Sequence, residues 1–324
     1  MISVSLYDTC CNILWLTHVP VSSHLVPLTG LAQGYNHSLT KSCILRTIAW
    51  VTTNRLVLTC PISSSTRRKR DGVEHHGKRA LKILHTADVH LDCDSYGKAE
   101  QRQAHRTLYE RCFQTIIERA LTAEVDALLI AGDLFDHNRV PDDTIAFVQE
   151  QLRRLQRPVV ILPGNHDCLY TNAIYDRHDF QAACTNVRVI TELQGQVIEL
   201  PDLDLVLWGR AMAEHTPSFH PLEHIPTRHD QRWHIALAHG FFYQTRQQPD
   251  RSSPIFAEEI RDTGWDYVAL GHQHVLTDVS QGSVTAYYSG APLVHWTGET
   301  PHGHVLLLEL SPAHGIRVQP ERVL

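Results

Sequence analysis

Five short polar motifs, each placed after an apolar, strand-like run, constrain the fold of this chain more than any other feature. In chain order they are Asp-x-His at 88–90, Gly-Asp at 132–133, Gly-Asn-His-Asp at 164–167, a single His at 239 and Gly-His-x-His at 271–274. Polar side chains at the carboxyl ends of strands converge at one edge of an α/β sheet, where such folds form their binding sites. Glycines in these motifs let the backbone turn sharply beside a ligand.

Each motif alone is a weak signal. A lone Asp-x-His or a lone histidine at a strand end is more often structural, and Gly-Asn-His-Asp could be a turn whose Asn and Asp cap backbone groups. The ordered set of five is far more demanding, and we put chance agreement at roughly a few per cent or less. The set therefore predicts one composite site.

The spacing of apolar residues predicts the elements that carry these motifs. Apolar runs predict strands at 82–87, 126–132, 158–164, 187–190, 196–200, 205–210, 233–240, 266–272, 284–290 and 304–310, and periodicity predicts helices at 99–122 and about 141–156. Strand–helix alternation comes early and strand-rich sequence follows. This order predicts an α/β layered sandwich of two mixed β-sheets flanked by helices.

Residues 1–80 differ from the remainder of the chain. They carry nine Lys/Arg against three Asp/Glu, whereas residues 81–324 carry 20 against 32. We interpret 1–80 as an N-terminal extension, disordered or non-native, with translation beginning at Leu81; a transit peptide is the alternative. The basic cluster at 67–70 is a localisation or nucleic-acid patch or, more commonly, a solvated linker. The acidic remainder argues against a broadly basic nucleic-acid surface but leaves a local basic groove open.

The cysteines and the hydropathy pattern bear on the compartment. Cys93, Cys112, Cys168 and Cys184 show no Cys-x-x-Cys spacing, so we expect reduced thiols and a cytoplasmic location. No apolar run approaches 18 residues, and we therefore expect no membrane association.

The five motifs in this order resemble the signature of the calcineurin-like metallophosphoesterase superfamily, over essentially all of residues 81–324. The flanking sequences ILHTADVHL (83–91), AGDLFD (131–136), DYVALGHQH (266–274) and YSGAP (288–292) are most similar to the SbcD-type DNA-repair exonuclease branch. The resemblance implies that 81–324 is a calcineurin-like metallophosphoesterase catalytic domain.

The resemblance also implies a dinuclear metal site. One metal would be held by Asp88, His90 and His274, the second by Asn165, His239 and His272, with Asp133 bridging the two. This mixture of oxygens and imidazoles suits Mn²⁺, with Fe²⁺ or Zn²⁺ as alternatives.

Two further residues of the Gly-Asn-His-Asp motif receive roles from the same resemblance. His166 would be the non-ligand histidine that stabilises the transition state and protonates the leaving oxygen. Asp167 would orient the His166 imidazole or, equally, cap a turn.

The expected function is metal-dependent hydrolysis of phosphodiester bonds by an SbcD-like DNA nuclease. Two departures count against the nuclease assignment. Some nucleases of this branch carry a phosphate-positioning His where this chain has Asp136, with His137 one residue later. The chain also ends 50 residues after His274, so we expect the usual cap domain to be lacking and the region that binds an SMC-like ATPase partner to be absent.

The alternatives are a phosphatase or phosphodiesterase acting on a small nucleotide or phosphomonoester, and a non-catalytic scaffold with the same fold. A homodimer is open in each case. Outside the motifs, His215 is expected to be an exposed loop residue. Core packing is expected for Phe241 or Phe242, with lining of the site or stacking on a base as the alternative.

Overall fold

The computed structural model describes residues 14–16, 48–52, 55–59, 78–93, 99–247, 249–294 and 303–324. The chain divides into two compact units, Met1–Glu74 and His75–Leu324. In the first unit, β1 (Leu14–Leu16), β3 (Arg55–Thr59) and β2 (Ile48–Thr52) pair in that order as an antiparallel sheet. The interpretation of 1–80 as a disordered or non-native extension concerns mainly residues outside the described ranges, and it stays a prediction.

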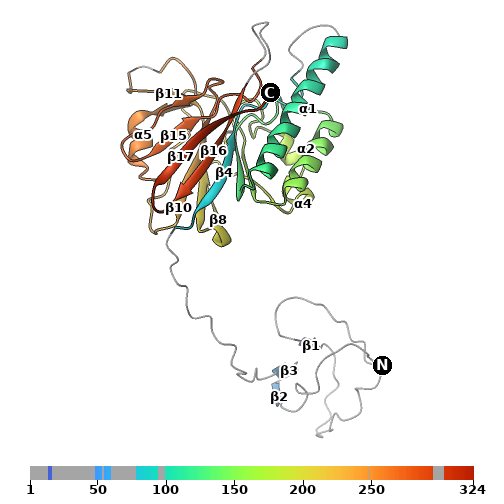
Figure 1. Cartoon of the computed structure of the whole chain (residues 1–324). Helices are drawn as coiled ribbons and strands as arrows, with labels where there is room; N and C mark the ends of the chain where they lie inside the picture. The colour runs from blue at the N-terminus through green and yellow to red at the C-terminus, as the bar shows by residue number, and fades with distance from the viewer. Residues whose placement is uncertain are drawn as a thin grey trace. The chain divides into compact units, whose positions relative to one another are not determined.

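The second unit contains two six-stranded mixed sheets (Figure 1). The first has the order β17 (Gly315–Arg322), β16 (His304–Ser311), β4 (Leu81–Thr86), β5 (Ala127–Ala131), β6 (Val159–Leu162), β7 (Val187–Val189). The second has the order β14 (Thr277–Asp278), β15 (Thr285–Tyr288), β13 (Tyr267–Gly271), β10 (Trp233–His239), β9 (Leu205–Gly209), β8 (Gln196–Leu200). Strands β4–β7 are parallel to one another, as are β9, β10, β13 and β15, and the remaining strands β8, β14, β16 and β17 pair antiparallel.

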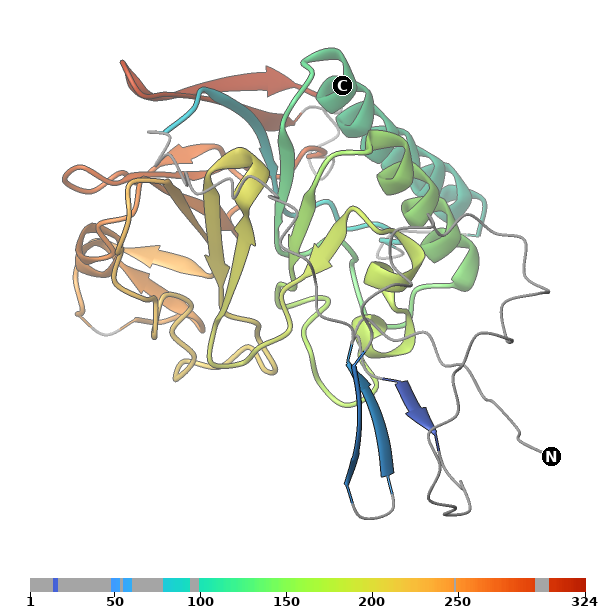
Figure 2. The ribbon, with the colours of Figure 1, turned by 90° about the horizontal axis from the view of Figure 1, so that it is seen from below.

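Helices cover the outer face of the first sheet (Figure 2). These are α1 (Ala99–Thr122), α2 (Asp142–Leu155), α3 (Ile174–Arg177) and α4 (Phe180–Ala183). Alternate strand residues such as Leu128 and Ile161 pack against the helical residues Phe113 and Leu152. A strand that is buried on both faces is apolar throughout, which explains the continuous hydrophobic runs of β5 and β6.

The inner faces of the two sheets pack against each other. Ile83, Leu129 and Val160 of the first sheet share a buried cluster with Ile235 and Tyr267 of the second. The outer face of the second sheet is closed by a third cluster that includes Ile260 of α5 (Ala257–Asp262). The result is an α/β/β/α arrangement, so the predicted α/β class with two mixed sheets and flanking helices is confirmed.

The predicted strands and both predicted helices are present in the structure, and several elements were missed. The largest of these is β17, whose sequence GIRVQPER is polar, mostly exposed and contains Pro320. Proline is tolerated there because β17 is an edge strand. The short strands β11 (Phe241–Tyr243) and β12 (Pro254–Phe256), which pair in parallel, were also missed.

Two further features concern the cysteines and the helices. Cys93, Cys112, Cys168 and Cys184 are all buried thiols outside any disulfide. Among the described residues, no helix has the length and apolar character that crossing a membrane requires.

Candidate metal centre

The structure brings the five motifs together at the carboxyl ends of β4, β5, β6, β10 and β13. Backbone hydrogen bonds continue past the strand ends and fix the loops: Asp88 N–H donates to the Gly132 carbonyl and His90 N–H to the Asp133 carbonyl, both at 3.0 Å. The two sheets are linked here as well, because His239 Nδ1 lies 2.9 Å from the Ala131 carbonyl oxygen. Rigid strands therefore position side chains from segments far apart in the sequence.

The backbone of the candidate site residues is unusual. Asp88, His90 and Asp133 have φ of 54°, 51° and 52°, and His272 has φ of 101°. Non-glycine residues rarely adopt positive φ, and such residues cluster at functional sites where the surrounding structure maintains the strain. The positive φ changes the direction in which each side chain leaves the backbone. The side chains can therefore point toward one another beyond the ends of the strands.

Gly132 explains why the second motif begins with glycine. It has φ of +98°, and a Cβ atom placed there would lie 2.0 Å from Nδ1 of His239. Any side chain would collide with a residue of the site itself. The glycine is required by the close approach of β5 to the end of β10.

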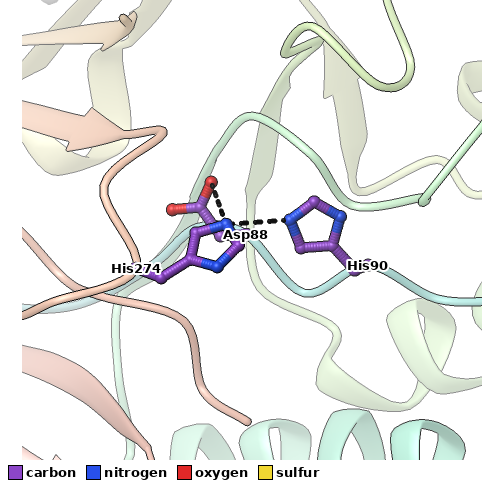
Figure 3. A group of neighbouring side chains, drawn as sticks. All are labelled: Asp88, His90 and His274. Atoms are coloured by element: carbon purple, nitrogen blue, oxygen red, sulfur yellow. Dashed lines mark hydrogen bonds and ion pairs between the residues drawn. The ribbon is translucent and has the colours of Figure 1, made fainter. Parts of the chain in front are cut away.

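Asp88, His90 and His274 form the first cluster (Figure 3), with one ligand atom from each within 4.8 Å of the others. His90 Nε2 lies 3.2 Å from His274 Nε2, and His274 Nε2 lies 3.9 Å from a carboxylate oxygen of Asp88. His90 Nδ1 lies 3.0 Å from the Asp136 carboxylate. A proton on Nδ1 satisfies that carboxylate and leaves the Nε2 lone pair directed into the cluster.

Asp133, His239 and His272 form the second cluster, and Asn165 joins it. The Asn165 side-chain oxygen lies 3.0 Å from His239 Nε2 and 2.8 Å from His272 Nδ1. The carbonyl of Ala131 can only accept, so His239 carries a proton on Nδ1 and presents Nε2 to the cluster. Oxygen and nitrogen atoms that can bind a metal thus face one another across a small space.

The Asp133 carboxylate lies between the two clusters. Its Oδ2 atom is 3.2 Å from His239 Nε2 in the second cluster and 3.9 Å from His90 Nε2 in the first. Its Oδ1 atom accepts a hydrogen bond of 2.9 Å from the His166 backbone N–H. One oxygen is therefore held by the backbone while the other faces both clusters.

Burial and close charges shift the pKa values of the acidic residues in opposite directions. Burial raises the pKa of Asp88 to about 6. Burial acts in the same direction on Asp133, but the charges of His239, His90 and His166 and a hydrogen bond from His239 outweigh it, so the Asp133 pKa is strongly lowered. Asp133 therefore remains ionised through the whole neutral range.

The histidines divide in the same way. Burial lowers the pKa of His272 to about 3 and of His274 to about 4. For His239 the effect of burial is outweighed by the charge of Asp133, which raises the pKa to about 9. A divalent cation needs deprotonated ligands. When bound, it would replace the proton of His239 as the positive charge beside Asp133.

The last two residues of the Gly-Asn-His-Asp motif, His166 and Asp167, have different surroundings. The His166 side chain is 42% exposed, and its Nδ1 lies 2.7 Å from the Asp136 carbonyl oxygen. Asp167 is fully buried. Its carboxylate accepts hydrogen bonds from the backbone N–H groups of Gly164, Leu134 and Phe135 at 2.7, 3.1 and 3.3 Å.

A fourth hydrogen bond to Asp167, of 2.8 Å, comes from the Tyr175 hydroxyl. These four contacts favour the turn-capping alternative over an orienting contact with His166. Asp167 ties the loop after β6 to the loop after β5.

The structure identifies residues near the centre that sequence reasoning did not assign. Asp136, noted only as a departure from the family pattern, contacts His90 and lies 3.6 Å from His166 Nδ1. His215 is exposed, as expected, yet its ring lies 5.1 Å from that of His272. Position in the sequence gives no signal for either contact, because both depend on how separate loops meet.

The fold and the site together define a class of protein, and comparison with known proteins identifies it. A model of the calcineurin-like phosphoesterase family matches residues 81–276, more than half of the 324 residues. The chain belongs to the calcineurin-like phosphoesterase family, a family of metal-dependent phosphoester hydrolases with a dinuclear divalent metal centre.

Individual relatives cover smaller parts. The chain is 40% identical to the DNA double-strand break repair protein Mre11 of Aeropyrum pernix over 89 residues, 26% of this chain and 21% of that protein. It is 32% identical to the SbcD component of the nuclease SbcCD of Escherichia coli over 94 residues, 28% of this chain and 22% of that protein.

The chain matches the uncharacterized metallophosphoesterase YhaO of Bacillus subtilis over a longer stretch, with 26% identity over 232 residues. That match spans 65% of this chain and 52% of YhaO. The chain thus spans about half, or less, of the length of these curated relatives. The resemblance to the SbcD branch is confirmed at this partial coverage.

The two clusters fit a pair of divalent ions. Each combines at least one carboxylate with imidazole nitrogens, the donor set that suits Mn²⁺, Fe²⁺ or Zn²⁺. The ligand atoms converge, the Asp136 carboxylate orients His90, and Asp133 faces both clusters. The chemistry and the convergence of these side chains are those that a dinuclear site requires.

Proposed function

We propose that this protein hydrolyses phosphodiester bonds with two divalent metal ions held at the centre described above. Asp88, His90 and His274 would hold the first ion, Asn165, His239 and His272 the second, and Asp133 would contribute to both. The observation that carries the proposal is the position of Asp133 Oδ2, 3.2 Å from a histidine of one cluster and 3.9 Å from a histidine of the other.

When bound, such a pair of ions activates a water molecule and neutralises the phosphoryl oxygens. Mn²⁺ is the proposed metal. The protein's own contribution is to hold the ligand side chains in place. The strand ends position them, and the hydrogen bond between Asp136 and His90 orients the His90 imidazole.

His166 is the proposed acid. The Asp136 carbonyl oxygen can only accept, so the hydrogen bond at 2.7 Å places a proton on His166 Nδ1 and leaves Nε2 for the substrate. The ring packs edge-on against His90, with centroids 4.6 Å apart, so it borders the first cluster. From this position, protonated Nε2 can donate to the leaving oxygen as the ester bond breaks.

Asp167 is proposed as a positioning residue. By accepting backbone N–H groups from two loops, it fixes the Gly-Asp-Leu-Phe segment that carries Asp133 and Asp136 relative to the turn that carries His166. Its effect on the reaction passes through these loops.

DNA is the proposed substrate, and the reaction is that of a nuclease acting in DNA repair. This rests on the likeness to Mre11 and to the SbcD component of SbcCD, whose names describe a double-strand break repair protein and part of a nuclease. A cytoplasmic location belongs to the same proposal. Exposed basic side chains near the centre, such as Arg251, offer local contacts for a phosphate backbone within an acidic domain.

Hydrolysis of bis-p-nitrophenyl phosphate by the full-length protein with Mn²⁺ tests the chemical step. The expected result is activity that falls about 100-fold or more in His166→Ala and in Asp133→Ala. Retention of full activity by both variants would contradict the proposal.

A small nucleotide or phosphomonoester is the second candidate substrate. It is favoured because residues 81–324 contain 32 acidic and only 20 basic residues, a charge balance that repels a long phosphate backbone. Comparing single-stranded DNA with a panel of nucleotides at low salt separates the two. Hydrolysis of nucleotides without cleavage of DNA would favour the second candidate.

A further inference from the structure

Phe241 occupies a different environment from its neighbour Phe242. Phe242 packs against the hydrophobic cluster on the outer face of the second sheet, whereas Phe241 belongs to none of the hydrophobic clusters of the described residues. Successive strand residues point to opposite faces. The partly exposed Phe241 ring lies 5.1 Å from the ring of His272, so it borders the second metal cluster.

An arginine covers this aromatic ring. The guanidinium carbon of Arg251 lies 5.3 Å from the centroid of Phe241. Arg251 is exposed, and its charge acts on the neighbouring Asp250 carboxylate. An exposed guanidinium backed by an aromatic ring therefore lies beside the metal centre.

The position of Arg251 is fixed by the strand that carries Phe241. The Arg251 backbone N–H donates to the Tyr243 hydroxyl at 2.9 Å, and that hydroxyl donates to the Asp250 carboxylate at 2.7 Å. The Phe241 N–H donates to the Ser253 carbonyl at 3.0 Å. These contacts hold the backbone of the loop at 250–253 against β11.

His215 borders the same side of the centre. Its ring lies 5.1 Å from His272 in an edge-on arrangement, and the loop that carries it is tied to the same segment because Ser253 N–H donates to the Thr216 carbonyl. Three flat groups, the rings of Phe241 and His215 and the Arg251 guanidinium, thus lie beside the second cluster. His166, by contrast, borders the first cluster.

We propose that Phe241, Arg251 and His215 form a platform that binds the nucleobase of a nucleotide phosphodiester while its phosphate lies at the metal centre. This inference rests on the proposed phosphodiesterase function and names the substrate class of the same site. Aromatic side chains and guanidinium planes both stack on bases, and such stacking tolerates any base because every base has a π face. The Arg251 guanidinium, which lies over one face of the Phe241 ring, supplies the outer stacking plane and attracts the negative charge, Phe241 supports it from below, and His215 lies beside His272.

The platform accounts for two features together. A flat stacking surface beside a phosphate-binding centre would gain no stacking contact with a phosphomonoester that lacks a base, such as a sugar phosphate. It also gives an acidic domain a way to hold nucleic acid or nucleotides by stacking, in addition to charge.

The test compares two diesters with the same leaving group. In one, p-nitrophenol is esterified to thymidine 5′-phosphate, and in the other to methyl phosphate. The measured quantity is the ratio of kcat/KM for the nucleoside diester to kcat/KM for the methyl diester, in the full-length protein with Mn²⁺. We expect Phe241→Leu to lower this ratio at least about 5-fold, because leucine fills the space but cannot support the Arg251 guanidinium plane with an aromatic face.

The matched control is Phe242→Leu, the same substitution one residue along the strand on the face that packs in the core. We expect no change in the ratio, even where the protein becomes less stable. Phe241→Trp keeps an aromatic face and should retain at least half of the original ratio. A Phe241→Leu ratio equal to that of the original protein would overturn the platform.

Binding of 1,N⁶-ethenoadenosine 5′-monophosphate, followed by quenching of its fluorescence, provides a readout that needs no turnover. We expect at least about 5-fold weaker binding to Phe241→Leu and to Arg251→Ala than to Phe242→Leu. Equal binding to all variants would refute the platform whether or not the diesters are hydrolysed. If the original protein binds the probe through Phe241 yet hydrolyses neither diester, the proposed phosphodiesterase function fails while the platform stands.

Discussion

The Asp136 carboxylate lies 3.0 Å from Nδ1 of His90 and sets which nitrogen of that histidine faces the first metal cluster. Burial acts against the charge of Asp136, but the hydrogen bond and the charge of His90 outweigh it and lower its pKa below the usual value. A charged carboxylate behind an imidazole fixes its tautomer and makes the other nitrogen a better ligand.

Asp136→Asn should therefore weaken Mn²⁺ binding by about tenfold, because the amide can still accept a hydrogen bond but lacks the charge. Isothermal titration of metal-free protein with MnCl₂ measures this. The control is Asp230→Asn, which removes a carboxylate that contacts Arg232 before the amino end of β10. Unchanged affinity in Asp136→Asn would show that His90 does not depend on this contact.

Asp167 should matter for stability. Its carboxylate is fully buried and accepts three backbone N–H groups and the Tyr175 hydroxyl. Asp167→Ala leaves these donors without a partner and should lower the free energy of unfolding by about 3 kcal/mol or more, whereas Tyr175→Phe removes one contact and should cost about 1 kcal/mol. Urea denaturation of the metal-free variants measures both. Equal losses in the two variants would contradict the capping role.

Gly132 should tolerate no side chain. Its Cβ would lie 2.0 Å from His239, and its φ is +98°. Gly132→Ala should lower the free energy of unfolding by about 2 kcal/mol or more and weaken metal binding. Gly264→Ala is the control, since Gly264 also has positive φ, at +60°, but has nothing within 4 Å of the added atom. A smaller loss at Gly132 than at Gly264 would argue against the close contact of β5 with His239.

His85 should make stability depend on pH. It is buried between the sheets, with Nδ1 3.0 Å from the Tyr267 hydroxyl, and burial lowers its pKa from 6.5 to about 3. Below pH 6.5 the unfolded chain binds a proton there that the folded chain does not bind. The stabilising contribution is thus complete above pH 6.5 and is lost as the pH falls toward 3.

The free energy of unfolding should accordingly fall by about 1.4 kcal/mol per pH unit more steeply in the original protein than in His85→Gln, between pH 6 and 4. Denaturation of metal-free protein at several pH values gives both slopes. Parallel slopes would mean that His85 is not held neutral by the fold.

The sequence predicted the strands and most of the centre because their signals are local. A strand buried on both faces must be apolar along its whole length, as in β5 and β6, and the ligand motifs follow such strands directly. Contacts between loops leave no local signal. That Phe241 would border His272 while Phe242 packs in the core depends on the pairing of β11 with β12, two strands too short to recognise from their residues.

Edge strand β17 escaped prediction for a related reason. Its partner β16 supplies the hydrogen bonds, so its own sequence can be polar and contain Pro320. Asp167 shows the same limit in the site. The sequence left an orienting role beside His166 and a turn-capping role equally open, and only the fold shows that the carboxylate contacts the backbone of two loops.

The proposed function places Asp133 between two metal ions that would together support phosphodiester hydrolysis. Titration of metal-free, full-length protein with MnCl₂ tests this arrangement when bound metal and cleavage of bis-p-nitrophenyl phosphate are measured in the same samples. We predict two ions per chain and activity that rises with occupancy of the second ion. Asp133→Ala should lose both the two-ion binding and the activity. Binding of one ion or none, or the same activity in metal-free protein, would contradict the account.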